Sequence, residues 1–206
     1  MFLDVRCPGC DTPRFSLPRP ICAVCERLFG WSCPLEVPEI VEGVAGALHQ
    51  GKPRNVVLAG KGGGRSAVFT QLGVSFSRTQ LAQRWAAECS AVTWVPASTE
   101  KSRNRGFDQG DVFARSIGQQ LGFRPTRMLV RVGKHRQTGR SRAERSLGPQ
   151  IRGCVESPES VLLVDDVVTT GASVLSAASA LRTSGATSVY VVAITNRKNS
   201  DNYALL

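Results

Sequence analysis

The chain lacks any long hydrophobic run. Within its 206 residues, no apolar stretch approaches the roughly 18 residues that a bilayer-spanning helix needs, so no membrane partner is expected. The start of the chain, MFLDVRCPGC, contains no basic segment followed by an apolar one, so we expect no secretion signal. These absences predict a cytoplasmic protein, in which paired cysteines more often bind a metal than form a disulfide.

Acidic residues are scarce relative to basic ones: 16 Asp and Glu stand against 26 Lys and Arg, a formal net charge of +10. The excess is local, because residues 101–145 hold twelve Lys and Arg and only three acids. Such a stretch favours an anion, either a pyrophosphate group or a nucleic-acid backbone, and a solvated charge run without a ligand is the alternative. Stacking aromatics would support nucleic acid, but Phe107, Phe113 and Phe123 are predicted to be helical or buried.

The most informative motif is VLLVDDVVTTGAS at residues 161–173. The run from Val161 to Val164 is short and apolar, as expected of a buried strand in a parallel sheet. Asp165 and Asp166 follow it, at the edge where open α/β sheets bind ligands. A turn then opens a helix predicted over Ala172–Thr183, whose N-terminus favours an anion. This turn consists of Thr169, Thr170, Gly171, Ala172 and Ser173.

This order of residues predicts a sugar phosphate as the ligand. The two carboxylates suit a diol or a hydrated Mg²⁺, and the hydroxyl and N–H groups of the turn suit a phosphate. No Gly-Lys-Ser/Thr follows, which excludes a P-loop at this segment. Capping of a loop and a helix without any ligand is the plain alternative, because N-capping hydroxyls are common.

Four cysteines near the N-terminus have the spacing of a zinc site. CPGC at 7–10 and CAVC at 22–25 form two C-x₂-C pairs separated by eleven residues. Such pairs hold tetrahedral Zn²⁺, and the proline-rich segment between them has few residues that would form a core without a metal. We therefore predict a structural Zn²⁺ on Cys7, Cys10, Cys22 and Cys25. A redox dithiol and a site that has lost its metal are the alternatives.

The remaining pattern alternates strands and helices, which is typical of an α/β fold with a mostly parallel sheet flanked by helices. We predict helices over 39–49, 79–89 and 108–121, and strands over 55–59, 91–95 and 188–194. A small zinc-ribbon-like unit over residues 1–35 precedes one larger domain over residues 36–206.

Further cations lie next to predicted strand ends. Lys61, within GKGGGR at 60–65, and Arg103 and Arg105, which follow the strand over 91–95, are candidates to bind an anion. The polar segment 134–149 is long for a connection within a compact domain, which favours a mobile lid. This lid would carry Arg136, Gln137, Arg142 and Arg145.

Taken in order, these motifs resemble those of the ComF family of phosphoribosyltransferase-like proteins over nearly the whole chain. The resemblance rests on the cysteine pairs, on RGFDQ at 105–109, on QTGRSRAER at 137–145 and on VLLVDDVVTTGAS. It implies a type I phosphoribosyltransferase fold with a zinc-ribbon-like appendage, and 5-phosphoribosyl pyrophosphate (PRPP) bound with Mg²⁺. Where this chain has Asp108, relatives usually have Asn, so a negative charge lies near the expected pyrophosphate.

The resemblance also implies roles for the site residues. Asp165 and Asp166 would hold the ribose hydroxyls, and the turn from Thr169 to Ser173 would bind the 5′-phosphate. Arg103, Arg105 and Lys61 would receive the pyrophosphate, and the lid would exclude water from PRPP. Asp165, Asp166 and Arg105 are the candidate catalytic residues.

Three functions are open at this point. The first is an enzyme that transfers phosphoribosyl to an acceptor that the sequence does not identify. The second is a PRPP- or nucleotide-binding adaptor without turnover. The third is a protein that handles single-stranded DNA, with DNA or a DNA-uptake helicase as its partner, because named members of the family are linked to natural competence. A homo-oligomer is open for each of them.

Overall fold

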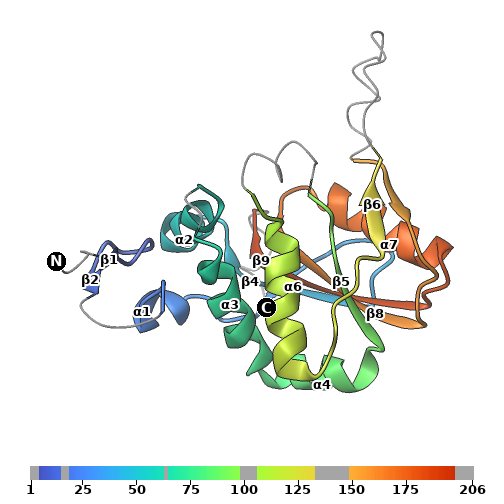
Figure 1. Ribbon diagram of the computed structural model, residues 1–206, viewed down its shortest axis with the longest axis horizontal. Helices are drawn as coiled ribbons and strands as arrows, with labels where there is room; N and C mark the ends of the chain where they lie inside the picture. The colour runs from blue at the N-terminus through green and yellow to red at the C-terminus, as the bar shows by residue number, and fades with distance from the viewer. Residues whose placement is uncertain (1–4, 15–18, 63–64, 98–105, 133–148, 198–206) are drawn as a thin grey trace, which may run out of the picture.

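The computed structural model describes residues 5–14, 19–62, 65–97, 106–132 and 149–197. Its centre is a five-stranded sheet in the order β3-β4-β9-β8-β5 (Figure 1). The strands from β4 to β5 in this order are parallel, and β3 joins the edge in the antiparallel direction. The strands are β3 (Cys33–Pro34), β4 (Glu42–Leu48), β5 (Ala91–Trp94), β8 (Ser160–Val168) and β9 (Ser188–Asn196).

Helices and two small sheets surround this central sheet. The helices are α1 (Ala23–Glu26), α2 (Gly51–Gly62), α3 (Ala67–Ser77), α4 (Gln80–Glu88), α6 (Gln109–Leu121) and α7 (Ala172–Thr183). The small antiparallel sheets pair β1 (Val5–Arg6) with β2 (Pro13–Arg14) and β6 (Leu129–Arg131) with β7 (Ile151–Gly153).

Alternate side chains of β8 enter two separate cores, because successive residues of a strand point to opposite faces of the sheet. Leu162 and Val164 lie in one core, together with residues of α3, α4 and α6. Val161 and Leu163 lie in the other core, with residues of α7, β6 and β7. Burial on both faces explains why this strand is apolar without alternation. The predicted α/β class, with a mostly parallel central sheet flanked by helices, is confirmed.

The N-terminal segment shares a core with the larger part of the chain. The elements β1, β2 and α1 lie at one end of the molecule, beside α2 and α3 (Figure 1). Ile21, Cys25 and Trp31 are buried in the same core as Phe76. Gln71 of α3 accepts from Ile21 N at 2.9 Å and donates to Ile21 O at 3.0 Å. The domain boundary at residue 35 stays a prediction. Substitution of a residue that makes these contacts, such as Gln71, can test whether the two parts unfold together.

The helix predicted over 39–49 is wrong. The strand β4 occupies Glu42–Leu48 and pairs in parallel with β9. The apolar positions of this segment fit a helical stripe, but Gly43 and Gly46 are poor helix formers. Pairing with β9 offers the segment a buried place in the sheet, which its local spacing does not reveal.

The strand predicted over 55–59 is also wrong, because these residues lie within α2. Burial in this helix is limited to Val56, Val57 and Gly60, which follow helical spacing, while Leu58 is exposed. The other predicted elements are confirmed as α4, α6, β5 and β9, and α7 has its predicted bounds.

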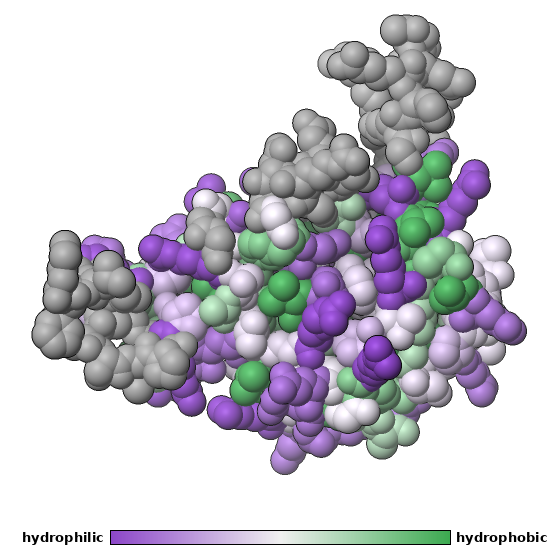
Figure 2. Space-filling model, viewed as in Figure 1, coloured by the Kyte–Doolittle hydropathy of each residue, from purple (hydrophilic) through white to green (hydrophobic). Residues whose placement is uncertain are grey.

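Within the described ranges, no helix is both long and apolar enough to cross a bilayer. On the face shown in Figure 2, the apolar side chains of the described residues form small patches between polar ones.

Much of the basic stretch 101–145 lies outside the described residues, which omit 98–105 and 133–148.

Candidate functional site

A cavity of about 300 Å³ lies where the parallel strands end. Its walls come from the residues that follow β4 and β5, from the end of β8, and from α2, α6 and β6. The carboxyl ends of parallel strands meet at one edge of a sheet, so segments that are distant in the sequence come together here.

Asp165 and Asp166 line the cavity, and they lie within β8 rather than after it. The strand predicted to end at Val164 continues to Val168, because β9 pairs with it along that length. On the other side, β5 ends at Trp94, which is paired with Val164. Beyond this point β8 has no β5 residue beside it, and its two carboxylates are reachable from the cavity.

The two carboxylates have different surroundings. Asp166 Oδ2 lies 2.8 Å from Lys61 Nζ, in an ion pair whose side chains are each 19% exposed. Asp165 Oδ1 accepts from the backbone N–H of Asp166 at 2.8 Å. Burial, and next the charge of Asp166, raise the pKa of Asp165 to about 8, although Lys61 and Arg131 act in the opposite direction. The raised pKa favours the protonated form of Asp165 in the free protein, as expected for neighbouring carboxylates in a desolvated place.

The turn after β8 forms the next part of the cavity. Thr169 and Ser173 line it, and Thr170, Gly171 and Ala172 complete the turn between them. Gly171, the N-cap of α7, has a φ of 81°, in the left-handed region that favours glycine. The first N–H groups of a helix have no partners within it and favour an anion. Thr170 Oγ1 accepts from one of them, the Ala172 N–H, at 3.4 Å.

A second wall is fixed by two side chains from distant parts of the chain. Asp108, the N-cap of α6, accepts from the N–H groups of Ala97 at 3.2 Å and Gly110 at 3.0 Å. Arg131 of β6 donates from Nε to Pro96 O at 3.1 Å. Burial raises the pKa of Asp108 and lowers that of Arg131. The backbone at Pro96 and Ala97 is thus fixed by two hydrogen bonds, one to Arg131 and one to Asp108.

His49 and Leu58 form a third wall. His49 follows β4, and its Nδ1 lies 2.8 Å from Thr195 Oγ1 on β9. Burial, together with the charges of Lys61 and Arg197, lowers the pKa of His49, which favours the neutral form of its ring. Leu58 is 42% exposed and adds an apolar surface to the cavity.

The cavity brings together several residues that the sequence predicts for one ligand: Lys61, Asp165, Asp166, Thr169 and Ser173. The other predicted ligand residues of the turn lie between the last two. Six predicted residues lie outside the described part of the chain, and their roles stay predictions; they are Arg103, Arg105, Arg136, Gln137, Arg142 and Arg145.

The sequence motifs do not assign a role to four residues that line the cavity: His49, Leu58, Gln109 and Arg131. His49 is missed because of the wrong helix over 39–49. A strand over these residues would have placed His49 at the ligand edge of the sheet. Gln109 does carry a signal, since it ends the RGFDQ motif. Arg131 carries no comparable signal in the sequence, because it belongs to none of the motifs quoted above and is one of many cations in the basic stretch 101–145.

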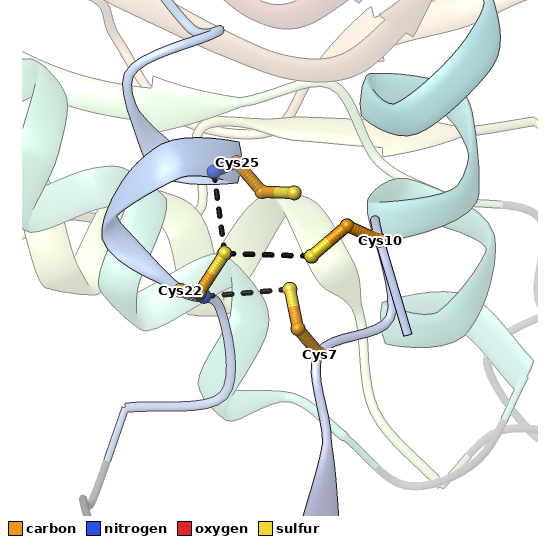
Figure 3. A group of neighbouring side chains, drawn as sticks. All are labelled: Cys7, Cys10, Cys22 and Cys25. Atoms are coloured by element: carbon orange, nitrogen blue, oxygen red, sulfur yellow. Dashed lines mark hydrogen bonds between the residues drawn. The ribbon is translucent and has the colours of Figure 1, made fainter. Parts of the chain in front are cut away.

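A separate cluster of cysteines lies between the β1–β2 unit and α1. The sulfur atoms of Cys7, Cys10, Cys22 and Cys25 lie within 4.8 Å of one another and turn toward a common centre (Figure 3). Cys10 Sγ and Cys22 Sγ are 3.6 Å apart. Zn–S bonds of about 2.3 Å in a tetrahedron place sulfurs about 3.8 Å apart, so this donor set fits Zn²⁺.

The close approach of these cysteines depends on Gly9. A Cβ at this position would lie 2.7 Å from Cys25 Sγ. Burial raises the pKa of Cys25, whereas hydrogen bonds with Thr12 lower the pKa of Cys10 to about 6. A thiolate beside buried thiols is an arrangement that a bound cation would stabilise.

Comparisons with known proteins give similarity over part of the chain. No protein-family model matches it. It is 35% identical over 95 residues to the orotate phosphoribosyltransferase of Pyrococcus furiosus, which is 44% of this chain and 52% of that protein. It is 51% identical over 47 residues to the orotate phosphoribosyltransferase of Levilactobacillus brevis, which is 23% of this chain and 22% of that protein.

The chain thus spans about half the length of the first of these relatives and less than a quarter of the second. Among solved structures, the allosteric regulatory enzyme of purine biosynthesis is similar, with a TM-score of 0.36 and 21% identity. That similarity covers 61% of this chain and 26% of the other. Membership of the ComF family stays a prediction.

Proposed function

We propose that this protein binds PRPP and transfers its 5-phosphoribosyl group to a nitrogen acceptor, as type I phosphoribosyltransferases do. The observation that carries this proposal is the juxtaposition of Asp165 and Asp166 with Thr169 and Ser173 at one cavity. A pair of carboxylates beside an anion-binding turn fits ribose 5-phosphate, whose hydroxyls and phosphate are attached to one small ring. Similarity to two orotate phosphoribosyltransferases supports the same class of ligand.

The 5′-phosphate would bind at the N-terminus of α7. The helix dipole and the N–H groups of the first turn favour a dianion there, and the hydroxyls of Thr169 and Ser173 add donors. Gly171 allows the turn to close around such a group, because its left-handed backbone is strained for any residue with a Cβ.

The oxygen donors of the cavity support the binding of a pyrophosphorylated sugar together with a cation. Among the described residues that line it, three carboxylates, those of Asp108, Asp165 and Asp166, face the two cations Lys61 and Arg131. Mg²⁺ fits this donor set, because it prefers hard oxygen ligands and keeps several waters. Asp165 and Asp166 would hold it, and the bound ion would neutralise charge on the pyrophosphate.

The reaction requires little acid–base chemistry from the chain. The bond between ribose C1 and the pyrophosphate oxygen breaks, its electron pair leaves with the pyrophosphate, and C1 forms a bond to the acceptor nitrogen. The two carboxylates and the turn would hold the ribose at both ends, which positions C1 for the acceptor. N–H and guanidinium groups on the second wall would favour the negative charge that develops on the leaving group.

For the cysteine cluster we infer a structural Zn²⁺. Support comes from the four Sγ atoms within 4.8 Å of one another and from the short elements that carry them. Elements of two to four residues have little stability of their own, so a metal would contribute directly to their folding.

Calorimetric titration with PRPP, in the presence and absence of Mg²⁺, tests the main proposal. We expect saturable binding that depends on Mg²⁺. The double variant Asp165→Asn with Asp166→Asn should bind about 100-fold more weakly, because two charge-assisted contacts are lost. Asp111→Asn is the matched control, since Asp111 pairs with Arg115 on α6 and does not line the cavity.

Incorporation of labelled pyrophosphate into PRPP separates transfer from binding. Orotate is the first acceptor to test, because it appears in the names of both relatives. Exchange with any acceptor supports an enzyme, whereas tight binding without exchange supports the adaptor function. A folded wild-type protein that does not bind PRPP would overturn the proposal.

A further inference from the structure

The third wall of the cavity, formed by His49 and Leu58, takes no part in the steps proposed above. It lies on the opposite side of β8 from the second wall, because β9 and β4 follow β8 in one direction across the sheet and β5 in the other. The N–H of His49 donates to Asn196 O at 2.7 Å, which keeps His49 beside the end of β9. The second wall instead includes Pro96, which follows β5. The cavity therefore has two side walls, with the two carboxylates of β8 between them.

The two side walls suit the two partners of a displacement at ribose C1. In a single displacement, the acceptor enters on the face of the sugar opposite to the leaving group. The second wall is assigned above to the charge that develops on the pyrophosphate, so the acceptor would enter from the third wall. Leu58 is 42% exposed there and offers an apolar surface to the acceptor.

The transfer requires one proton to move on the acceptor side. A neutral acceptor nitrogen that forms a bond to C1 would keep a positive charge unless its N–H proton leaves. A base within hydrogen-bond distance of such a proton accelerates the step by roughly 10²- to 10⁴-fold.

The ring of His49 is fixed at one nitrogen and open at the other. Its Nδ1 lies 2.8 Å from Oγ1 of Thr195, which is buried on β9. With the proton on Nδ1, the ring donates to this hydroxyl oxygen and Nε2 keeps a lone pair. Among the described residues, no group is hydrogen-bonded to Nε2. Burial lowers the pKa of His49, which favours the neutral ring that can accept a proton.

The carboxylates of the cavity are engaged elsewhere. Asp166 forms its ion pair with Lys61 at 2.8 Å, and Asp165 is assigned with Asp166 to the cation and the ribose. Asp108 accepts from two backbone N–H groups on the second wall, which is the side of the leaving group. Within the described part of the chain, His49 is therefore the base that lines the third wall.

We propose that His49 accepts the proton that the acceptor nitrogen loses as it forms its bond to ribose C1. The electron pair of the C1–O bond leaves with the pyrophosphate, the lone pair of the nitrogen forms the C1–N bond, and the N–H proton moves to Nε2 of His49. The hydroxyl of Thr195 accepts from Nδ1 throughout, which stabilises the imidazolium that results. This assignment rests on the proposed function and adds to it a catalytic residue on the acceptor side.

Exchange of labelled pyrophosphate into PRPP, with candidate acceptors beginning with orotate, tests this assignment on wild type and His49→Asn. The amide nitrogen of Asn can replace Nδ1 opposite Thr195, but no atom of Asn replaces Nε2. We expect an exchange rate about 100-fold lower, with an unchanged Kd for PRPP in calorimetric titration. Gln50→Asn is the matched control, since Gln50 is the exposed neighbour of His49 and does not line the cavity.

The pH dependence of the exchange rate distinguishes a base from a structural residue. The wild-type rate should fall as the pH drops below 6.5, the ordinary pKa of His, because a protonated ring accepts no proton. The charges of Lys61, Arg197 and Arg54 move this decline to lower pH, and the charge of Asp166 acts in the opposite direction. In His49→Asn this decline should be absent, and the comparison cancels the titration of PRPP itself.

The outcomes separate this assignment from the proposed function. Equal exchange by wild type and His49→Asn would overturn the assignment, although the proposed function would stand. Weaker PRPP binding by the variant, or a slower exchange that keeps the decline at low pH, would show a structural role and also overturn it.

Thr195→Val is the second variant, for the case that His49→Asn does not fold. It keeps the ring of His49 and removes the oxygen at Nδ1, so we expect slower exchange with unchanged PRPP binding. A rate equal to that of wild type would refute the assignment. If wild type exchanges with no acceptor, the proposed transfer fails and this assignment fails with it.

Discussion

The carboxyl group of Asp165 allows a quantitative prediction about the free protein. Its pKa rises from 3.8 to about 8 through burial and the charge of Asp166. Between these two pH values the folded chain holds a proton that the unfolded chain has lost. Stability therefore falls as the pH rises through this window, by at most about 1.4 kcal/mol per pH unit for one proton.

The variant Asp165→Asn removes this proton while it keeps the shape of the side chain. We expect the variant to gain at most about 3 kcal/mol on wild type between pH 5 and pH 7, because only wild type loses stability in that range. Below about pH 4 the carboxyl is protonated in both states, so the gain should be absent there. The same substitution should weaken PRPP binding, by less than the double variant does, so stability and binding change in opposite directions.

Thermal unfolding of both proteins at pH 5, 6 and 7 measures this difference, since titrating groups that do not interact with Asp165 cancel in the comparison. In a chain of this size about 1 kcal/mol shifts Tm by about 2–4 °C, so the gap should widen by several degrees. Asp166→Asn is the control, because it leaves Lys61 without its partner at 2.8 Å and should be less stable than wild type. A Tm gap that is the same at pH 5 and pH 7 would show that Asp165 holds no such proton.

Three further substitutions test other parts of the structure. In Gly9→Ala the new Cβ would lie 2.7 Å from Cys25 Sγ, so atomic absorption should find less zinc per chain than in Gly62→Ala, whose Cβ meets nothing within 4 Å; equal zinc in both would contradict the close packing. In Gly171→Ala the φ of 81° should cost about 1–2 kcal/mol and lower Tm by several degrees, and an unchanged Tm would contradict this strain. In Gln71→Leu the backbone groups of Ile21 lose their buried partner, at about 1–3 kcal/mol. Calorimetry should then show a single, less stable transition, whereas an early separate transition would place a folding boundary near residue 35.

The elements that the sequence predicts correctly are those in which local signals and tertiary packing agree. The helix α4 begins after Thr79, whose Oγ1 accepts from Ala82 N at 3.1 Å, and both cap and helix are visible as local pattern. The helix α7 begins at Ala172, directly after the glycine that its N-cap requires. The cysteine spacing likewise predicts the cluster, because two short C-x₂-C turns bring their sulfurs together with little help from the rest of the chain.

The elements that the sequence misses depend on which strands become neighbours. Residues 42–48 fit a helical stripe as well as a strand, and only the pairing of β4 with β9 decides between them. The error has a functional consequence, since it hides His49 at the ligand edge. Arg131 is missed for a similar reason, because nothing near it in the sequence shows that β6 lies beside Pro96.

The position of the cavity follows from an inequality of strand lengths. The strand β8 has nine residues and its neighbour β5 has four, so the last part of β8 lies beyond the end of β5. Asp165 and Asp166 fall in this part, where one side of the strand is open to a ligand and the other still pairs with β9. The same arrangement desolvates Asp165 and raises its pKa. A strand that ended at Val164 would leave both carboxylates in solvent, with less cost to stability and no fixed geometry for a ligand. The arrangement that would fix both carboxylates for the proposed ligand is therefore also the one that weakens the fold.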